Sequence, residues 1–227
     1  RSQVLAKQFA RTKNAGLPLL DKTPTIDKLV KKSLTASKAW AKDAKKRQQL
    51  LFKAANEIEK SRSELIAVMM AEAGKTIAEA DVEVSEAVDF ARYYASLIPE
   101  LVNNKEAKFT PDKLTLVVPP WNFPVAIPIG GVLAALAAGS TVILKPAPEV
   151  RNCGVAVASA LYKAGISKSV LQVVAAPDNE VGLHLVGHEG VDSVTLTGGF
   201  ETAELFKKHK PTMRLTAETS GKNALVV

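Results

Sequence analysis

An asparagine held among prolines is the first candidate for chemistry in this sequence. Asn122 lies in the segment VPPWNFP (residues 118–124), after a short apolar run and before an apolar helical pattern. Prolines restrict the backbone, and an immobilised side-chain amide can donate to the oxyanion that develops when a carbonyl carbon is attacked. The same pattern is also typical of a stiff loop whose asparagine caps the next helix.

Two further segments offer contacts for a ribose or a phosphate. Lys145 ends an apolar run and precedes Pro146, so its ammonium can reach a nucleotide lying at the edge of a sheet. Thr197-Gly198-Gly199 separates a β-rich run from a helical pattern and exposes backbone N–H groups at the positive end of a helix. The alternatives are a solvent-exposed lysine and an ordinary tight turn, and the dinucleotide fingerprint GxGxxG is absent.

Glu218 is the candidate general base. It follows an apolar-edged run at 213–217 and precedes Ser220-Gly221-Lys222. A half-buried carboxylate at the C-terminal end of a strand can accept a proton from water. An ion pair with Lys222 accounts for the same residue without catalysis.

Three other residues are assigned structural roles. His184 and His188 are four apart, as metal ligands on one helix face are, but Leu-Val-Gly separates them and no third ligand follows. We therefore predict no metal site. Cys153, the only cysteine, lies in a helical pattern without a motif, which indicates a structural thiol and excludes a disulfide framework.

The elements that must position these residues are of two kinds. From Thr25 to about Glu100, apolar residues recur at three- and four-residue spacing, which predicts helices with a break at Gly74 and a long helix over 77–97. After Pro111, short β-rich runs alternate with helical segments, which predicts a mainly parallel sheet covered on both faces. Strands are expected at 114–118, 142–144, 170–174, 193–197, 214–217 and 224–227, and helices at 129–138, 149–164, 180–186 and 202–208. Ligands of such a sheet bind beyond the carboxyl ends of its strands.

Composition and charge exclude several classes of protein. The 227 residues are 47% hydrophobic and 23% charged, which excludes general disorder. Residues 1–60 carry 15 Lys+Arg against 5 Asp+Glu, so the net charge of +7 is concentrated there. Residues 1–60 contain only three aromatic residues, Phe9, Trp40 and Phe52, which is too few for a stacking platform, so the lysines predict a solvated helical face rather than a nucleic-acid site.

The sequence also predicts neither a secretory peptide nor a membrane span. Its first residues lack an apolar signal core. The stretch 114–144 has no charged residue, but prolines and glycines interrupt it, so we predict strand, loop, helix and strand there. With a single cysteine, the expected location is the cytoplasm.

The order of these motifs resembles the NAD(P)-dependent aldehyde dehydrogenase superfamily. The resemblance covers residues 35–227 and rests on PWNFP (120–124), Lys145-Pro146, Thr197-Gly198 and the ExxGK pattern at 218–222. The segments EAGKT (72–76) and DFARYY (89–94) look like that family as well. The segment AETSGKNA (217–224) looks most like the corresponding segment of the dehydrogenases of proline catabolism. These oxidise L-glutamate γ-semialdehyde, in equilibrium with 1-pyrroline-5-carboxylate, to glutamate.

The resemblance implies an α/β fold of the aldehyde dehydrogenase type, an aldehyde substrate, NAD or NADP as cofactor, and a homo-oligomeric full-length protein. It makes Asn122 the donor to the oxyanion and Glu218 the base that activates water to hydrolyse a cysteine thioester. Lys145 is expected at the adenosine ribose and Gly198 under the pyrophosphate. The full set expected to bind the cofactor is Val118, Pro119, Trp121, Lys145, Gly182, Thr197, Gly198, Gly199 and Thr202. The expected domains are an N-terminal helix and connector (1–27), a helical region (28–110) and an incomplete dinucleotide-binding α/β domain (111–227).

This sequence departs from the family pattern at three points. Pro148 stands where the family usually has a glutamate, with Glu149 next, so the choice between NAD and NADP is left open. Gly199 and Phe200 replace a serine and a threonine. The family's nucleophilic cysteine follows the general base in sequence, and Cys153 is in the wrong place to replace it. We therefore expect residues 1–227 to correspond to the N-terminal half of such an enzyme, truncated before its catalytic domain and inactive alone.

Three other functions stay open at this point. A reductase of acyl phosphates shares the architecture and the cysteine chemistry but needs no hydrolytic base, so Glu218 argues against it. A non-catalytic nucleotide-binding protein would need no cysteine at all. Nucleic-acid binding through the basic N-terminal region would weaken steeply with salt.

Overall fold

The computed structural model describes residues 17, 20–221 and 224–226, and it separates helices from strands as the sequence predicts. The first half contains α2 (Thr23–Lys42), α3 (Ala44–Lys60), α4 (Arg62–Glu72) and α5 (Ile77–Asn103). The second half contains β1 (Leu114–Val118), α6 (Ala126–Ala138), β2 (Thr141–Leu144), η1 (Pro148–Val150), α7 (Arg151–Lys163), β3 (Leu171–Val173), α8 (Glu180–Gly187), β4 (Ser193–Thr197), α9 (Phe200–His209) and β5 (Leu215–Glu218). Most of the segment expected to hold a short helix before residue 23 lies outside the described residues.

The five strands form one parallel sheet in the order β3-β2-β1-β4-β5. The chain moves outward from β1 through β2 to β3 and then returns to the other side of β1 for β4 and β5. The strand order therefore reverses between β1 and β4, and a crevice opens at the carboxyl ends of strands at such a point. This arrangement confirms the predicted α/β fold.

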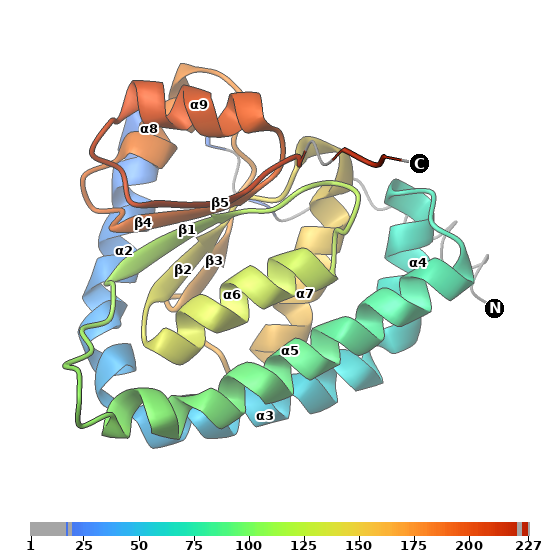
Figure 1. Ribbon diagram of the computed structural model, residues 1–227, viewed down its shortest axis with the longest axis horizontal. Coiled ribbons are helices and arrows are strands. Elements are labelled where there is room, and N and C mark those ends of the chain that lie inside the picture. Colours follow the sequence, from blue (N-terminus) through green and yellow to red (C-terminus); the bar gives the residue numbers. More distant parts are fainter. Residues whose placement is uncertain (1–16, 18–19, 222–223, 227) are drawn as a thin grey trace.

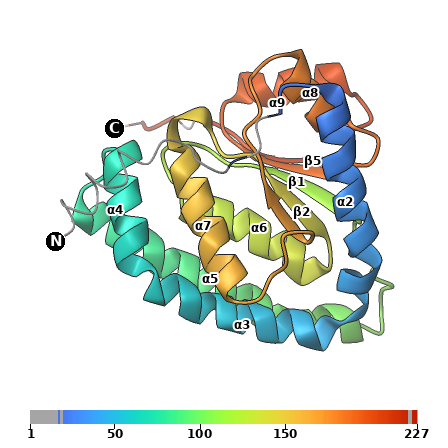
Figure 2. The same cartoon turned by 180° about the vertical axis from the view of Figure 1, so that it is seen from behind.

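Two hydrophobic cores cover the two faces of the sheet. α3, α5, α6 and α7 lie on one face, and α2, α8 and α9 lie on the other (Figures 1 and 2). Successive residues of β1 alternate between them, since Leu116 belongs to the core with α2 and Val117 to the core with α6. α2 thus packs on the sheet rather than on the other N-terminal helices alone.

The predicted break at Gly74 and the predicted start of the long helix at Ile77 are confirmed. The sequence did not predict the breaks between α2, α3 and α4, and α5 extends to Asn103. Gly74 has φ of +66°, a conformation that favours glycine, and it separates α4 from α5. Thr76 and Glu79 form a reciprocal capping box at the start of α5. α5 continues past Pro99, which lacks an N–H group, because the Gln48 side chain donates to the carbonyl of Ala95 at 3.1 Å.

Arg47 joins the ends of two helices. Its guanidinium donates to the carbonyls of Trp40 and Ala41 in α2 and of Ala137 in α6, and the side chain is buried. A cation at helix C-termini is favoured because the carbonyls there carry partial negative charge. Burial lowers the pKa of Arg47. The lysines of α2 and α3 are exposed, as expected for a solvated face.

Glu83 of α5 is buried against the start of α6. Its Oε1 accepts from the N–H groups of Val125 at 2.7 Å and Ala126 at 3.0 Å. Its Oε2 lies 2.5 Å from Nζ of Lys75, and the Glu83 side chain is 1% exposed. A carboxylate can replace the missing acceptors of a helix N-terminus and interacts favourably with its positive end.

The uncharged stretch 114–144 forms β1, a loop, α6 and β2, as predicted. α6 begins three residues earlier than expected because Pro128 falls in its first turn, where a proline is tolerated. Among the described residues, no helix is long and apolar enough to cross a lipid bilayer.

Two sequence predictions need correction. The helix expected at 149–164 is divided into η1 and α7. The strand expected at 224–227 is wrong for residues 224–226, which form no strand, and Val227 lies outside the described residues. Leu225 and Val226 are 89% and 92% exposed, so their apolar side chains have no face of the sheet to cover.

We expect Glu83→Ala to lower the free energy of unfolding by about 3–5 kcal/mol, because it leaves the Lys75 ammonium and two helix N–H groups without their partner. Urea denaturation measures this change. Glu86→Ala is the matched control, since Glu86 lies on the exposed face of the same helix and should change stability by less than about 0.5 kcal/mol. Equal effects of the two substitutions would contradict the assigned role of Glu83.

Candidate functional site

A cavity of about 850 Å³ lies at the carboxyl ends of the strands, beside the point where the strand order reverses. Its lining comes from the loop after β1, the end of β2, the connection into α8, the turn into α9 and the end of β5. All eleven residues expected to bind the cofactor or to act in catalysis line it: Asn122, Glu218, Val118, Pro119, Trp121, Lys145, Gly182, Thr197, Gly198, Gly199 and Thr202. The fold thus brings together side chains that are far apart in the sequence.

The loop that carries Asn122 is held in place by the buried ion pair of Lys75 with Glu83. The ammonium of Lys75 lies 4.2 Å from the centre of the Phe123 ring, a cation–π contact. The N–H of Val125, two residues further on, donates to Glu83. Asn122 is exposed and does not cap α6, because Glu83 accepts from the first N–H groups there. The alternative of a capping asparagine is therefore wrong.

Lys145 is buried rather than exposed. Its side chain is 8% exposed, and its Nζ lies 2.9 Å from Oδ1 of Asp178, which belongs to the connection between β3 and α8. Sequence reasoning identified the lysine but missed its partner, because the two residues meet only when β2 and β3 pair.

In the glycine turn before α9, the N–H group of Gly198 takes part in the hydrogen bonding of the sheet. Gly198 donates to the carbonyl of Glu218 at 3.1 Å, continuing the pairing of β4 with β5. Gly199 is the N-cap of α9. An anion bound at the N-terminus of α9 would therefore accept hydrogen bonds from the backbone N–H groups of the first turn of α9, and not from the N–H of Gly198.

Glycine is required at position 182 because α8 lies against the preceding connection. A Cβ atom at Gly182 would be 2.2 Å from the carbonyl oxygen of Pro177. Gly182 thus shapes the cavity wall by allowing this close approach rather than by offering a side chain.

Glu218 differs from its prediction in one respect. It lies at the end of β5 and lines the cavity, but it is exposed rather than half-buried. β5 pairs with β4 along one side and is the outermost strand of the described sheet, so its residues receive little cover. Lys222, the proposed partner of this carboxylate, lies outside the described residues.

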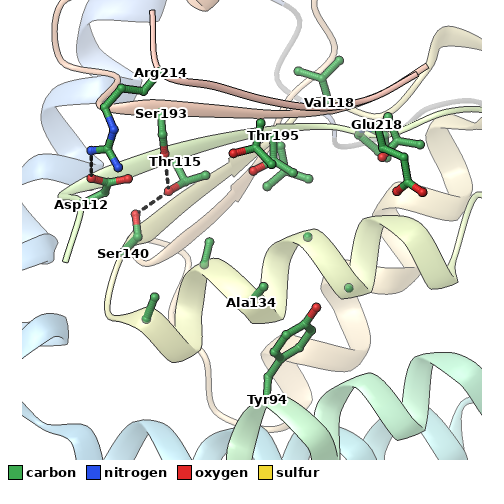
Figure 3. Close-up of a pocket in the computed structure, with 18 of the residues that line it drawn as sticks. Tyr94, Asp112, Thr115, Val118, Ala134, Ser140, Ser193, Thr195, Arg214 and Glu218 are labelled. Carbon is green, nitrogen blue, oxygen red and sulfur yellow. Dashed lines mark hydrogen bonds and ion pairs between the residues drawn. The ribbon is translucent and has the colours of Figure 1, made fainter. Parts of the chain in front are cut away.

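A second cavity of about 460 Å³ lies between α6 and the strands β1, β4 and β5 (Figure 3). Its wall is rich in hydroxyl groups, since Thr115 contacts Ser140 at 2.9 Å and Ser193 at 3.2 Å. The pair of Arg214 with Asp112 closes one end at 2.6 Å, and Glu218 lies at the other end. Glu218 is therefore reached from both cavities.

The two histidines singled out from the sequence meet an aspartate from α2. Oδ1 of Asp27 lies 3.5 Å from Nε2 of His184 and 3.2 Å from Nε2 of His188. This third potential ligand precedes the histidines by a long stretch of sequence, so the spacing did not reveal it. However, Nδ1 of His188 accepts from the N–H of Gly190 at 2.9 Å, so in the neutral ring Nε2 carries the proton and donates to Asp27. We interpret the cluster as a hydrogen-bonded link between α2 and α8.

Comparison with known proteins identifies the family to which this sequence and fold are similar. Residues 8–227 match the aldehyde dehydrogenase family. The chain belongs to the aldehyde dehydrogenase family. The resemblance inferred from the motifs around Asn122 and Glu218 is thereby confirmed.

The chain is similar to part of several longer proteins. The chain is 37% identical over 199 residues to a 1-pyrroline-5-carboxylate dehydrogenase of Bacillus pumilus, covering 80% of this chain and 39% of that protein. The structure of proline utilization A from Corynebacterium freiburgense is 47% identical, with a TM-score of 0.83, and the match covers 95% of this chain and 22% of that one. An NADP-dependent glyceraldehyde-3-phosphate dehydrogenase from Bacillus halodurans, complexed with NADP, is 27% identical, with a TM-score of 0.82, covering 89% and 46%. The chain thus spans less than half the length of these relatives.

Cys153 of this aldehyde dehydrogenase chain lies apart from the cavity. The residue is buried in α7, and its N–H donates to the Glu72 carboxylate at 2.8 Å. Burial, with a smaller contribution from the Glu72 carboxylate, raises the pKa of the thiol well above its usual value. A thiol that stays protonated is a poor nucleophile, so the structural role expected from the sequence accounts for this residue.

We expect the wild-type chain to lose stability relative to Cys153→Ala as the pH rises above about 9. The folded state holds the thiol proton more tightly than the unfolded state, so unfolding releases it in this range and becomes more favourable. The difference between the two free energies of unfolding should change by about 1 kcal/mol between pH 9 and 10. Urea denaturation of both proteins at pH 7 to 10 measures this difference, and a pH-independent value would contradict the assignment. Burial raises the pKa of Tyr162 to about 12. Because Tyr162 is present in both proteins, its contribution cancels in the difference between their free energies of unfolding.

Proposed function

We propose that this chain forms the dinucleotide-binding part of an enzyme that oxidises an aldehyde with NAD or NADP through a cysteine thioester. The best-supported substrate is L-glutamate γ-semialdehyde, because the chain is similar to proteins named 1-pyrroline-5-carboxylate dehydrogenase and to proline utilization A. A cytoplasmic location remains a prediction from the single cysteine, and a homo-oligomeric state remains a prediction from the family.

The observation that carries the proposal is that the eleven candidate residues line one cavity at the carboxyl ends of the strands. This is the position at which parallel α/β sheets bind nucleotides. The cavity combines a buried ammonium at Lys145, the N-terminus of α9 and a proline-rich loop, and these features fit a ribose, a pyrophosphate and a ring system. When bound, the nicotinamide supplies the hydride acceptor.

Two residues of the chain are assigned roles in the reaction. The amide of Asn122 donates to the oxygen of the carbonyl under attack, which stabilises the developing negative charge. The rigid loop holds this amide in place, so little reorganisation is needed when the charge appears. The carboxylate of Glu218 takes a proton from the water that hydrolyses the thioester, and its exposure gives water access to it.

The nucleophile is proposed to come from outside these 227 residues. Cys153 is the only cysteine of the sequence, and it is buried away from the cavity with a raised pKa. A thioester mechanism needs a thiolate beside Asn122, which Cys153 cannot provide.

The 227-residue chain should bind NAD, and Lys145→Ala should weaken this binding about tenfold, because it removes a charge-assisted hydrogen bond. Isothermal titration calorimetry measures both affinities. Lys53→Ala, which removes an exposed lysine of α3, is the control and should leave the affinity unchanged. Absence of binding by the wild-type chain would refute the proposed site.

The same chain should show no dehydrogenase turnover with glutamate γ-semialdehyde and NAD, measured by NADH absorbance. Its thiol should also react slowly with a thiol reagent until the protein is denatured, because it is buried. Measurable turnover that Cys153→Ala abolishes would show that Cys153 is the nucleophile and would overturn this assignment.

A further inference from the structure

The ion pair of Lys145 with Asp178 is the part of the cavity that the family pattern does not explain. Nζ of the buried lysine lies 2.9 Å from Oδ1 of the aspartate. The Asp178 side chain is 71% exposed, so one charge of the pair faces the cavity and solvent while the other is enclosed. A ligand group that approaches the ammonium must therefore also meet the carboxylate.

The backbone on both sides of Asp178 is fixed. Asn179 caps α8 by accepting from the N–H of Val181 at 2.9 Å. The close approach of Gly182 to the carbonyl of Pro177 holds the start of α8 against the connection. Asp178 lies between these anchors, so its carboxylate stays within reach of Lys145.

The charges that line the cavity disfavour additional negative charge on a ligand. Among the residues that the structure describes, they are one ammonium, from Lys145, and three carboxylates, from Glu149, Asp178 and Glu218. Pro148, which also lines the cavity, carries no charge. The Lys145 ammonium is already paired with Asp178, so a second phosphate on the adenosine ribose would gain little attraction from it and would meet the carboxylate.

We propose that Asp178, through its pair with Lys145, makes this site select NAD over NADP. This inference rests on the proposed dinucleotide site. The carboxylate accepts a hydrogen bond from the 2′-hydroxyl of the adenosine ribose, and the ammonium donates to the ribose oxygens. A 2′-phosphate is repelled by Asp178. Asp178 is thus a specificity-determining residue that no motif in the sequence reveals.

The test compares the affinities of NAD⁺ and NADP⁺ for the 227-residue chain by isothermal titration calorimetry, with 5′-AMP and adenosine 2′,5′-bisphosphate as smaller probes. Wild type should bind NAD⁺ more tightly than NADP⁺. Asp178→Asn should narrow the ratio of the two affinities at least about fivefold, the factor expected for each unit of charge on the 2′-phosphate at about 4 Å in a water-like medium. Asp178→Glu, which keeps the charge, should retain most of the preference.

Glu189→Gln is the matched control, because it removes one exposed negative charge outside this cavity and should leave the ratio unchanged. A wild-type preference for NADP⁺, or an equal effect of Asp178→Asn on both nucleotides, would overturn the role of Asp178 while leaving the dinucleotide site intact. If wild type binds none of the four nucleotides, the site itself is refuted, and the role of Asp178 with it.

Discussion

The buried carboxylate of Glu83 connects the helical half of the molecule to the half that carries the sheet. It accepts from the first N–H groups of α6 and pairs with Lys75, whose ammonium also lies over the ring of Phe123. Burying a carboxylate costs several kcal/mol, and the cost is offset only when its oxygens are all engaged. Phe123 and Val125 follow Asn122 closely in the same loop. The Glu83 carboxylate therefore links the position of the candidate oxyanion donor to α5, which is far from it in sequence.

Much of the fold follows from local patterns. Three- and four-residue spacing predicted the N-terminal helices, and the alternation of β-rich runs with helical segments predicted the parallel sheet. Pro99 and residues 224–226 show the limits of such patterns. A proline is tolerated in α5 because Gln48 satisfies the carbonyl that it leaves free, and an apolar run becomes a strand only beside a partner.

The candidate site was predictable as a set of residues but not as a set of interactions. Motif order singled out Asn122, Lys145 and Glu218, and the fold brings all three to one cavity. Their partners belong to other elements: Glu83 secures the loop of Asn122, and Asp178 pairs with Lys145. The exposure of Glu218 was also unpredictable, because it depends on the place of β5 at the edge of the described sheet. Pairings between distant segments are set by topology, which short-range periodicity does not encode.

The central place of β1 has a consequence for how the chain reaches this structure. β2 follows β1 after one helix, α6, whereas β4 follows only after β2, η1, α7, β3 and α8 as well, although both β2 and β4 pair directly with β1. Closing the longer loop costs more entropy, so the pairing of β1 with β2 is favoured first and leaves the opposite edge of β1 open. During synthesis on the ribosome, the backbone N–H and C=O groups of that edge remain unpaired until β4 emerges, and in this interval they can pair with another strand.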